Sequence, residues 1–453
     1  QQGLNQKAIC CAWFDEFKQK SATCADLEVF ESAHQQFVQQ RADKLRKVSV
    51  RRKAQIMSLP PLKKIENQLF DVSTLAEHLV QQAISLHNIH SEYDSVAKKQ
   101  ISFGLIRFAN IKPMIPIAKQ LFQLEMKPEW QDYQIHLCCY HSKQLLILRS
   151  TLEEKLDRIL NRTDSRKIFS QPEVMAAVAT SQAKHQLFIV LGSPVTEVGR
   201  DHDYDWAIVD PSSMRSIIQL AGRVWRHRPD KVAEQPNIAL LPTNWRGLAG
   251  QTGEIFKKPG FEDKQHPLET HRTEELIPVE QLERIDSLPR IIKRSDFRPH
   301  FCLADLEHQV TADLLNNPNT NCVNAYWDNA LSNRFTANLA LMSRFRESRK
   351  QRNIVCLLNE EGIPYFREQE RAWDTPDNPQ DALPEFRYQA LNVKNDFVKT
   401  WLDMSLPLAL SELAENLREE SLLFTALKYA TVTLDENTAQ WCFNETLGFW
   451  RED

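Results

Sequence analysis

The sequence predicts an α/β fold with a parallel sheet, followed by a mostly helical region. Short apolar runs, clearest at residues 101–108 and 133–140, alternate with helical patterns of about 10–15 residues. Strands separated by helices pair in parallel through right-handed crossovers. Glycine is scarce, with 11 in 453 residues, which favours long helices over the tight hairpins of a β-sandwich.

The predicted sheet domain spans residues 95–245. Its strands are expected at 101–108, 133–140, 187–191 and 206–209, and its helices at 111–124, 144–160, 173–182 and 213–225. Ligands of such sheets bind beyond the carboxyl ends of the strands. The segment that follows residue 191 lies at such an end.

Three regions flank the sheet. Residues 1–94 are expected to be a helical tail or linker, with residues 1–57 helical and an amphipathic helix at 71–90. Residues 246–299 are rich in proline and charge, which predicts a linker. Residues 300–453 are expected to form a mostly helical C-terminal domain, with helices at 305–315, 333–346, 398–404 and 408–429.

The composition excludes several classes of protein. A net charge of −4 excludes a uniformly basic nucleic-acid-binding protein, so a site of that kind must be local. Because there is no signal peptide and no run of 18 apolar residues, we expect no membrane partner and a cytoplasmic location. The nine cysteines include no Cys-x-x-Cys pair, which predicts reduced buried thiols rather than zinc ligands or disulfides.

Residues 219–226, Gln-Leu-Ala-Gly-Arg-Val-Trp-Arg, carry the strongest functional signal. Arg223 and Arg226 are three residues apart, on one face of the predicted helix. An arginine fork binds phosphate bidentately and keeps its charge, and an arginine finger accelerates phosphoryl transfer by about 10³–10⁵. Alone, the pair is more typical of a solvated basic face. Together with Gln219, Gly222 and the segment after residue 191, it favours nucleotide sensing.

Two segments resemble a known family. Residues 193–201, Ser-Pro-Val-Thr-Glu-Val-Gly-Arg-Asp, resemble motif V of the superfamily 2 helicases, and residues 219–226 resemble their motif VI. The amino-acid sequences of these two segments are similar to those of the same motifs in the helicase–nuclease of type I CRISPR interference. Tyr-His-Ser at 140–142 and Leu-Leu-Ile-Leu-Arg at 145–149 resemble the type I-F branch, which is fused to an adaptation subunit. The resemblance implies a RecA-like three-layer domain, the second of two motor domains.

The resemblance also implies roles for single residues. The set expected to contact the ATP γ-phosphate in catalysis is Gln219, Arg223 and Arg226. The set expected to bind the rest of the nucleotide is Gly199, Asp201 and Gly222. The set expected at the nucleic-acid backbone is Ser193, Thr196 and His141. For His141, a purely structural place at the end of a strand is an equally good interpretation.

Several parts of such a motor are absent from the sequence. There is no Gly-x-x-x-x-Gly-Lys-Ser/Thr loop for phosphates, no acidic Mg²⁺ motif after a strand, and no His/Asp set for a nuclease. The alternating Asp201, Asp203 and Asp205 lack the glycine and glutamate of a calcium loop. The resemblance therefore implies the C-terminal half of a larger enzyme. A first motor domain would complete the site for ATP with Mg²⁺, and the nuclease metal ions would lie elsewhere.

The function implied is ATP-dependent 3′–5′ translocation on single-stranded DNA, with unwinding and degradation of invading DNA. The expected partners are single-stranded DNA, a guide-RNA surveillance complex, the CRISPR adaptation integrase, and the first motor and nuclease domains of the same enzyme. Two alternatives stay open, namely another superfamily 2 nucleic-acid motor and a non-catalytic docking module. The presence of both Arg223 and Arg226 argues against the docking module.

Three basic runs, at residues 41–53, 290–298 and 344–352, are candidates for a groove that holds single-stranded DNA. A charge run is more often a solvated helix face, and the sequence does not say which run would line a groove.

Overall fold

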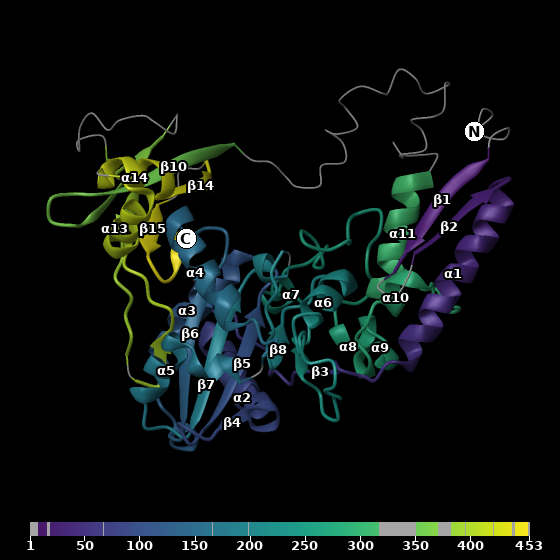
Figure 1. Cartoon of the computed structure of the whole chain (residues 1–453), viewed down its shortest axis with the longest axis horizontal. Helices are drawn as coiled ribbons and strands as arrows, with labels where there is room; N and C mark the ends of the chain where they lie inside the picture. Colours follow the sequence, from purple (N-terminus) through teal and green to yellow (C-terminus); the bar gives the residue numbers. More distant parts are fainter. Residues whose placement is uncertain are drawn as a thin grey trace.

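The centre of the molecule is one sheet (Figure 1). The computed structural model describes residues 8–451 except 16–18, 67, 165, 198, 317–349, 370–381, 395, 420 and 437–439. In the described residues, seven strands run parallel in the order β13-β6-β7-β5-β8-β9-β3. The short β4 (Glu92–Asp94) pairs antiparallel with the start of β5. The predicted parallel α/β class is confirmed.

The four predicted strands form within two residues of their expected limits. They are β5 (Lys99–Arg107), β6 (Tyr133–Tyr140), β7 (His185–Gly192) and β8 (Trp206–Val209). Along β5, Phe103 and Leu105 pack into one apolar cluster, whereas Ile106 packs into a second. This alternation, which follows from the pleat, gives the sheet two buried faces.

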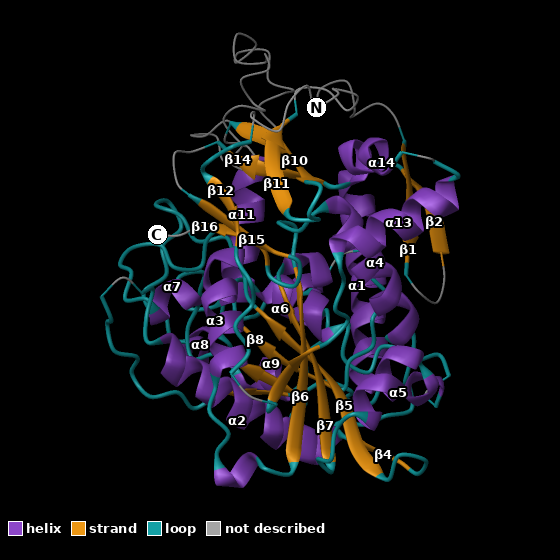
Figure 2. Ribbon diagram, turned by 90° about the vertical axis from the view of Figure 1, so that its left-hand side faces the viewer, coloured by secondary structure: helices purple, strands orange, loops and turns teal. Residues whose placement is uncertain are grey.

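Helices cover both faces (Figure 2). One face carries α4 (Leu146–Ile159), α5 (Pro172–Ala179) and α6 (Met214–Ala221). The other carries α2 (Val72–His90) and α3 (Ile111–Gln123). Each of these helices was predicted from its apolar period. The three-layer arrangement places the loops after β5, β6, β7 and β8 at one edge of the sheet.

The sheet also takes strands from outside residues 95–245. β3 (Ala54–Ile56) and β9 (Ile238–Leu240) pair beyond β8, and β13 (Val398–Thr400) pairs with β6 at the opposite edge. The prediction of a helix at 398–404 was therefore wrong. Val398 and Thr400 are β-branched, and the open edge of β6 supplies hydrogen-bond partners that the local sequence does not reveal.

The prediction that residues 1–57 are helical was only partly right. β1 (Ile9–Phe14) and β2 (Gln19–Cys24) form an antiparallel pair that precedes α1 (Leu27–Lys47). Trp13 packs against Phe37 of α1 and its indole donates to His34 at 3.0 Å. The aromatic residues that suggested one amphipathic helix are shared between this strand pair and α1.

The C-terminal region is mixed rather than mostly helical in its described part. α11 (Leu303–Asn316) confirms the helix at 305–315, whereas residues 333–346 lie outside the described residues. Helices α13 (Leu406–Leu417) and α14 (Leu422–Tyr429) replace the single helix expected at 408–429. The helical conformation is interrupted between them at Arg418, whose φ is +56°.

Two three-stranded sheets complete this region. One consists of β11 (Pro364–Glu368), β10 (Gln351–Leu358) and β14 (Thr431–Asp435). The other consists of β12 (Phe386–Tyr388), β15 (Trp441–Asn444) and β16 (Gly448–Arg451). Their apolar faces share a core with Leu145 and Leu148 at the start of α4. These six strands lie between or beyond the helices expected at 333–346, 398–404 and 408–429, and aromatic pairs such as Phe443 with Phe449 stabilise them.

Residues 246–299 pack against the α/β body instead of forming a free linker. They carry the short helices α8 (Thr273–Leu276), α9 (Val279–Glu283) and α10 (Leu288–Ile291), and α7 (Trp245–Leu248) precedes them. Phe256 is fully buried in the same cluster as β5. Within the described residues, every helix is too short or too polar to cross a bilayer.

We expect Gly104→Ala to destabilise the sheet. A Cβ on Gly104 would lie 2.2 Å from two ring atoms of Trp206, which is itself fully buried. Overpacking of this kind costs about 3 kcal/mol of the free energy of unfolding. The control is Gly362→Ala, at φ +76° with nothing within 4 Å, for which the backbone cost alone is about 1 kcal/mol. If urea unfolding showed equal losses of the free energy of unfolding in the two variants, the packing argument would be contradicted.

Candidate nucleotide and nucleic-acid site

Loop 193–201 leaves the carboxyl end of β7 through a tight 3₁₀ turn. The Ser193 carbonyl accepts hydrogen bonds from the Thr196 amide and hydroxyl, both at 3.0 Å. The Thr196 methyl group would lie 2.4 Å from a Cβ on Gly192, so only glycine fits the end of the strand. Gly199 has φ +71° and is exposed. The loop therefore begins buried and ends at the surface.

Loop 222–228 begins earlier than the sequence indicated. The helix expected at 213–225 ends at Ala221, because the following residues pair with Tyr204. The Tyr204 amide donates to the Arg223 carbonyl at 2.8 Å, and the Trp225 amide donates to the Tyr204 carbonyl at 3.0 Å. Arg223 and Arg226 consequently do not share a helix face, which corrects the geometric premise of the prediction.

The two arginines are held differently. The Arg223 guanidinium donates to the Glu197 carbonyl at 2.7 Å and to the Arg200 carbonyl, and only 8% of Arg223 is exposed. The Arg226 side chain is 41% exposed and pairs with Asp201. His227 contacts the second oxygen of Asp201 at 3.0 Å. Arg223 thus fastens loop 193–201, while Arg226 remains at the surface.

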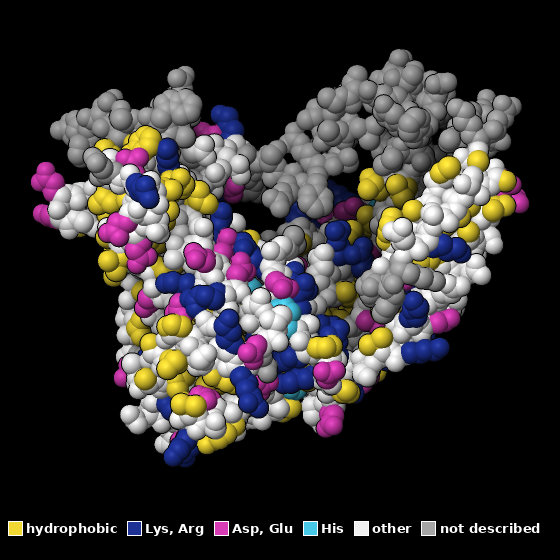
Figure 3. All heavy atoms as spheres, in the orientation of Figure 1, with side chains coloured by type: hydrophobic (Ala, Val, Ile, Leu, Met, Phe, Trp, Pro, Cys, Tyr) yellow, Lys and Arg dark blue, Asp and Glu magenta, His cyan; other side chains and the backbone are white. Residues whose placement is uncertain are grey.

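Asp201 is the surface carboxylate of this arrangement. Its hydrogen bond from Arg226 lowers the pKa of Asp201, with a further contribution from His227. Lys and Arg side chains gather along the middle of the face shown in Figure 3. A site with an ionised acid paired to an exposed arginine, at the carboxyl edge of a parallel sheet, suits a ligand that carries both hydroxyl and phosphate groups.

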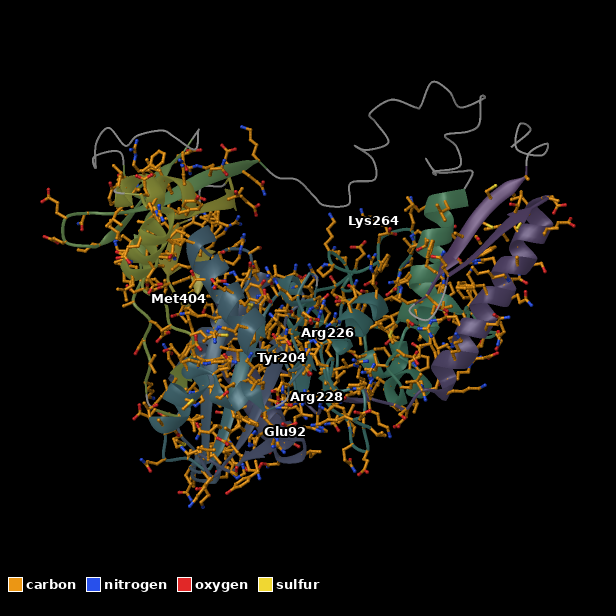
Figure 4. The ribbon with its side chains drawn as sticks, viewed as in Figure 1. Glu92, Tyr204, Arg226, Arg228, Lys264 and Met404 are labelled. Carbon is orange, nitrogen blue, oxygen red and sulfur yellow. The ribbon has the colours of Figure 1, made fainter. Side chains whose placement is uncertain are left out.

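A buried ion cluster lies beneath the two loops. Arg228 binds both oxygens of Asp203, at 2.6 and 3.1 Å, and one oxygen of Asp205 at 2.5 Å. Arg162 binds the same Asp205 oxygen at 2.6 Å, and Glu92 accepts from both arginines at 3.1 and 3.2 Å. In Figure 4 the labelled Arg226, Tyr204, Arg228 and Glu92 follow one another down the middle of the molecule.

Charge balance keeps this cluster ionised. Burial acts to raise the pKa of Asp205, but Arg162 and Arg228 outweigh it and lower that pKa. The second Asp205 oxygen accepts from the Phe103 amide at 2.8 Å, which ties the cluster to β5. Asp203 and Asp205 are therefore fully occupied by cations and amides of the protein.

A second buried cluster supports loop 193–201 from below. Glu197 pairs with Arg107 at the end of β5 and accepts from the Ser216 hydroxyl of α6 at 3.0 and 3.1 Å. Burial raises the pKa of Glu197, and Arg107 acts in the opposite direction. Asp210, at the end of β8, accepts from the Ala109 and Trp245 amides at 2.9 and 2.8 Å. These contacts fix the relative positions of three strand ends.

The sequence-predicted residues are only partly brought together. Gly199, Asp201, Arg223 and Arg226 meet at the junction of the two loops. Gln219 is exposed on α6, and Gly222 caps the end of that helix.

The residues that were predicted to contact the nucleic-acid backbone are buried in the protein. Thr196 is fully buried, and Ser193 is 2% exposed. His141 is fully buried, with Nε2 bonded to the Leu447 carbonyl at 2.8 Å and Nδ1 accepting from the Lys143 amide at 3.1 Å. His141 therefore holds the β15–β16 turn against the sheet and is not proposed as a nucleic-acid contact.

Sequence reasoning missed the buried arginines. Arg107 directly follows the apolar run 103–106 at the end of β5, and a charge next to such a run indicates a buried ion pair. Arg162 and Arg228 carry no comparable local signal. Their partners come from residues 43 and 25 positions away.

Two family models match the chain. One is described as CRISPR-associated nuclease/helicase Cas3, C-terminal, and matches residues 100–229. The other is described as CRISPR-associated Cas3 subtype I-F/YPEST-like, C-terminal domain, and matches residues 366–451. The first spans both loops of the candidate site, and the second spans the two small sheets.

Two curated relatives carry the same description. The chain is 37% identical over 452 residues to the CRISPR-associated nuclease/helicase Cas3 subtype I-F/YPEST of Pseudomonas aeruginosa (strain UCBPP-PA14), covering 97% of this chain and 40% of that protein. It is 38% identical over 310 residues to the protein of that description from Pectobacterium atrosepticum, covering 68% of this chain and 28% of the relative. The chain therefore spans less than half the length of these relatives.

Solved structures of T. fusca Cas3 are more distant. The AMPPNP complex has a TM-score of 0.39 at 13% identity and covers 86% of this chain and 36% of that chain. The ATP complex has a TM-score of 0.38 at 12% identity, covering 86% and 37%.

We expect Arg228→Ala to be far more destabilising than Arg226→Ala. Removing Arg228 leaves Asp203 without its ion-pair partner in the interior, which costs about 3–5 kcal/mol of the free energy of unfolding. Arg226, two residues earlier, makes an exposed ion pair worth about 1 kcal/mol or less. Urea unfolding of both variants tests this, and similar losses would show that the buried cluster does not control stability.

We also expect His141 to make stability depend on pH. Burial lowers the pKa of His141 to about 4, against about 6.5 for an unfolded chain. The unfolded chain is protonated first as the pH falls, so stability is complete above about pH 6.5 and is lost toward pH 4.

The matched variants are His141→Gln and the exposed His300→Gln. Between pH 7 and pH 5 the free energy of unfolding should fall in every protein, but by about 1–2 kcal/mol less in His141→Gln than in the unchanged protein. His300→Gln should follow the unchanged protein. Parallel pH dependence in all three proteins, measured by urea unfolding, would contradict the assignment.

Proposed function

Because the chain belongs to the CRISPR-associated Cas3 nuclease/helicase family of subtype I-F/YPEST, we propose that it forms the second motor domain and C-terminal domain of an ATP-dependent translocase on single-stranded DNA. The observation that carries this proposal is the junction of loops 193–201 and 222–228. There Arg223 fixes one loop to the other, and Arg226 and Asp201 remain at the surface.

Arg226 is the proposed arginine finger. Its only described partner is Asp201, itself 59% exposed, so exchange from carboxylate to phosphate costs little. Arg223 is a positioning residue in this proposal, because both of its terminal nitrogens already bind backbone carbonyls. Asp201, released from Arg226, would accept from a ribose hydroxyl.

The residues present fit a nucleotide phosphate. Arg226 offers a fork of donors, and Gly199 has nothing within 4 Å of a Cβ position, so backbone can approach a ligand there. The chain itself carries no phosphate loop. We propose that the phosphate loop, the carboxylates for Mg²⁺ and the nuclease metal site belong to parts of the enzyme that correspond to the remaining length of the relatives.

For single-stranded DNA, Ser193 stays a prediction of the sequence, since only 2% of the residue is exposed. Its hydroxyl makes no hydrogen bond within the described residues and lies at the strand end. We propose 3′–5′ movement, degradation of the translocated strand, and recruitment by a guide-RNA surveillance complex beside the adaptation integrase, all in line with the family. A docking module without catalysis is disfavoured, since it needs no exposed arginine held by one carboxylate.

The test compares arginine variants in a full-length family enzyme that carries this sequence. Arg226→Ala should lower the kcat of DNA-stimulated ATP hydrolysis by about 10³ or more, while single-stranded DNA binding is unchanged. Arg226→Lys should recover little, because lysine lacks the planar fork. The control is Arg298→Ala, which removes an exposed arginine paired with Asp296.

If the kcat of DNA-stimulated ATP hydrolysis by Arg226→Ala lay within twofold of that of the Arg298→Ala control, Arg226 would not be the arginine finger. If recruitment to the target-bound complex were lost in that variant while hydrolysis persisted, the docking module would replace the motor proposal.

A further inference from the structure

The three basic runs differ in how much of their charge is neutralised. In the second run, Arg290, Arg294 and Arg298 pair with Glu307, Asp305 and Asp296. In the described part of the third run, Arg352 pairs with Glu368 and Glu385, both at 2.9 Å. In the first run, Arg46 pairs with Asp43 and Lys53 pairs with Glu283, whereas Arg51 is the exception. Within the described residues, the Arg51 side chain makes no hydrogen bond or ion pair.

Arg51 and its neighbour Arg52 line a cavity of about 240 Å³, called the arginine cavity here. Its walls are the C-terminal end of α1, the segment 48–52, the C-terminal end of α6, and residues 284–287. Four arginines are among its lining residues, namely Arg41, Arg51, Arg52 and Arg284. Asp286 supplies the one carboxylate among the lining residues, so the walls carry a net positive charge.

One of these arginines, Arg284, has a clear structural role. Arg284 donates to the Leu45 and Val48 carbonyls, both at 3.1 Å, and so satisfies the C-terminal end of α1. It also approaches Asp286 at 3.7 Å. The charge of Asp286 is therefore already balanced by Arg284 and does not neutralise Arg51 or Arg52.

Only one side-chain nitrogen of Arg52 makes a hydrogen bond within the described residues. Its Nε donates to the Val224 carbonyl at 2.9 Å, and its two terminal nitrogens have no partner among the described residues. Burial, followed by the adjacent charge of Arg51, lowers the pKa of Arg52 to about 10, while Asp203 acts in the opposite direction, so Arg52 is charged at neutral pH. Two neighbouring cations with free donors in a partly buried cavity are unfavourable without an anion.

We propose that the arginine cavity binds a phosphate-bearing anion through the terminal nitrogens of Arg51 and Arg52. Guanidinium forks match the oxygen spacing of phosphate and bind it bidentately. The cavity volume exceeds that of a single phosphate and accommodates a linked pair. The anion neutralises the Arg51–Arg52 repulsion, which the charge of Asp203 offsets only in part at Arg52.

This site is separate from the proposed nucleotide-sensing surface, because Arg223, Arg226 and Asp201 are not among its lining residues. It is nevertheless connected to loop 222–228. Gly222 lines the cavity, and the Arg52 Nε holds the Val224 carbonyl. An occupied cavity fixes Arg52 and thereby the loop that presents Arg226. The inference goes beyond the proposed motor function and does not depend on it.

The experiment titrates pyrophosphate into this chain at low salt and measures binding by calorimetry. We expect a Kd below about 1 mM for the unchanged protein. Arg51→Gln should weaken binding at least tenfold, and the Arg51→Gln/Arg52→Gln double variant should abolish it. Arg51 makes no side-chain hydrogen bond, so Arg51→Gln keeps the test valid even if the loss of the Arg52–Val224 contact disturbs folding.

The matched control is Arg46→Gln, near the C-terminal end of α1 but not among the lining residues of the cavity, where Arg46 pairs with Asp43 at 2.8 Å. Equal pyrophosphate affinity in Arg51→Gln and Arg46→Gln, or no binding to the unchanged protein, would overturn the proposal.

Competition identifies the source of the phosphate. If an oligodeoxynucleotide displaces pyrophosphate from the unchanged protein, and loses affinity in Arg51→Gln, the natural ligand is a nucleic-acid backbone. If it does not displace pyrophosphate, the ligand is a small oligophosphate. Either result supports the site, and both are independent of ATP hydrolysis.

Discussion

The pairing of Arg228 with Asp203 and Asp205 is the interaction on which the rest of this site depends. It joins the segment after β7 to the segment after α6 in the interior of the sheet domain. Burying these charges is favourable only because each finds a partner, with Arg162 and Glu92 completing the set. Loss of one member leaves an uncompensated charge, so the two loops can keep only this relative position.

That constraint explains why two arginines three residues apart behave so differently. Pairing of residues 223–225 with Tyr204 ends α6 early and turns Arg223 inward, onto backbone carbonyls. Arg226 is left outside on Asp201. A rigid base with one exposed cation suits the proposed role of Arg226, since the finger can exchange partners while its supporting loop stays fixed.

The same edge of the sheet anchors the C-terminal region. His141 bonds the Leu447 carbonyl, and Gly448 packs so closely on the loop after β6 that a Cβ there would lie 2.5 Å from the Lys143 carbonyl oxygen. The C-terminal region is consequently fixed to the strand end next to β7. Its position relative to loop 193–201 is set by neutral, buried hydrogen bonds, which salt screens little.

The sequence by itself determined the parallel sheet, its four central strands, the helices on both faces, and the two segments that meet at the candidate site. Those features depend on apolar periodicity and on local motifs. Tertiary structure decided the strand at 398–400, the mixed C-terminal region, the early end of α6, the interior position of His141 and which of the described basic side chains pair with acids. Each of these depends on partners distant along the chain, namely an open strand edge, Tyr204, Leu447, or the acids that pair with Arg290, Arg294 and Arg352. Local sequence encodes the period of an element, but not which distant group will neutralise its charges or complete its hydrogen bonds.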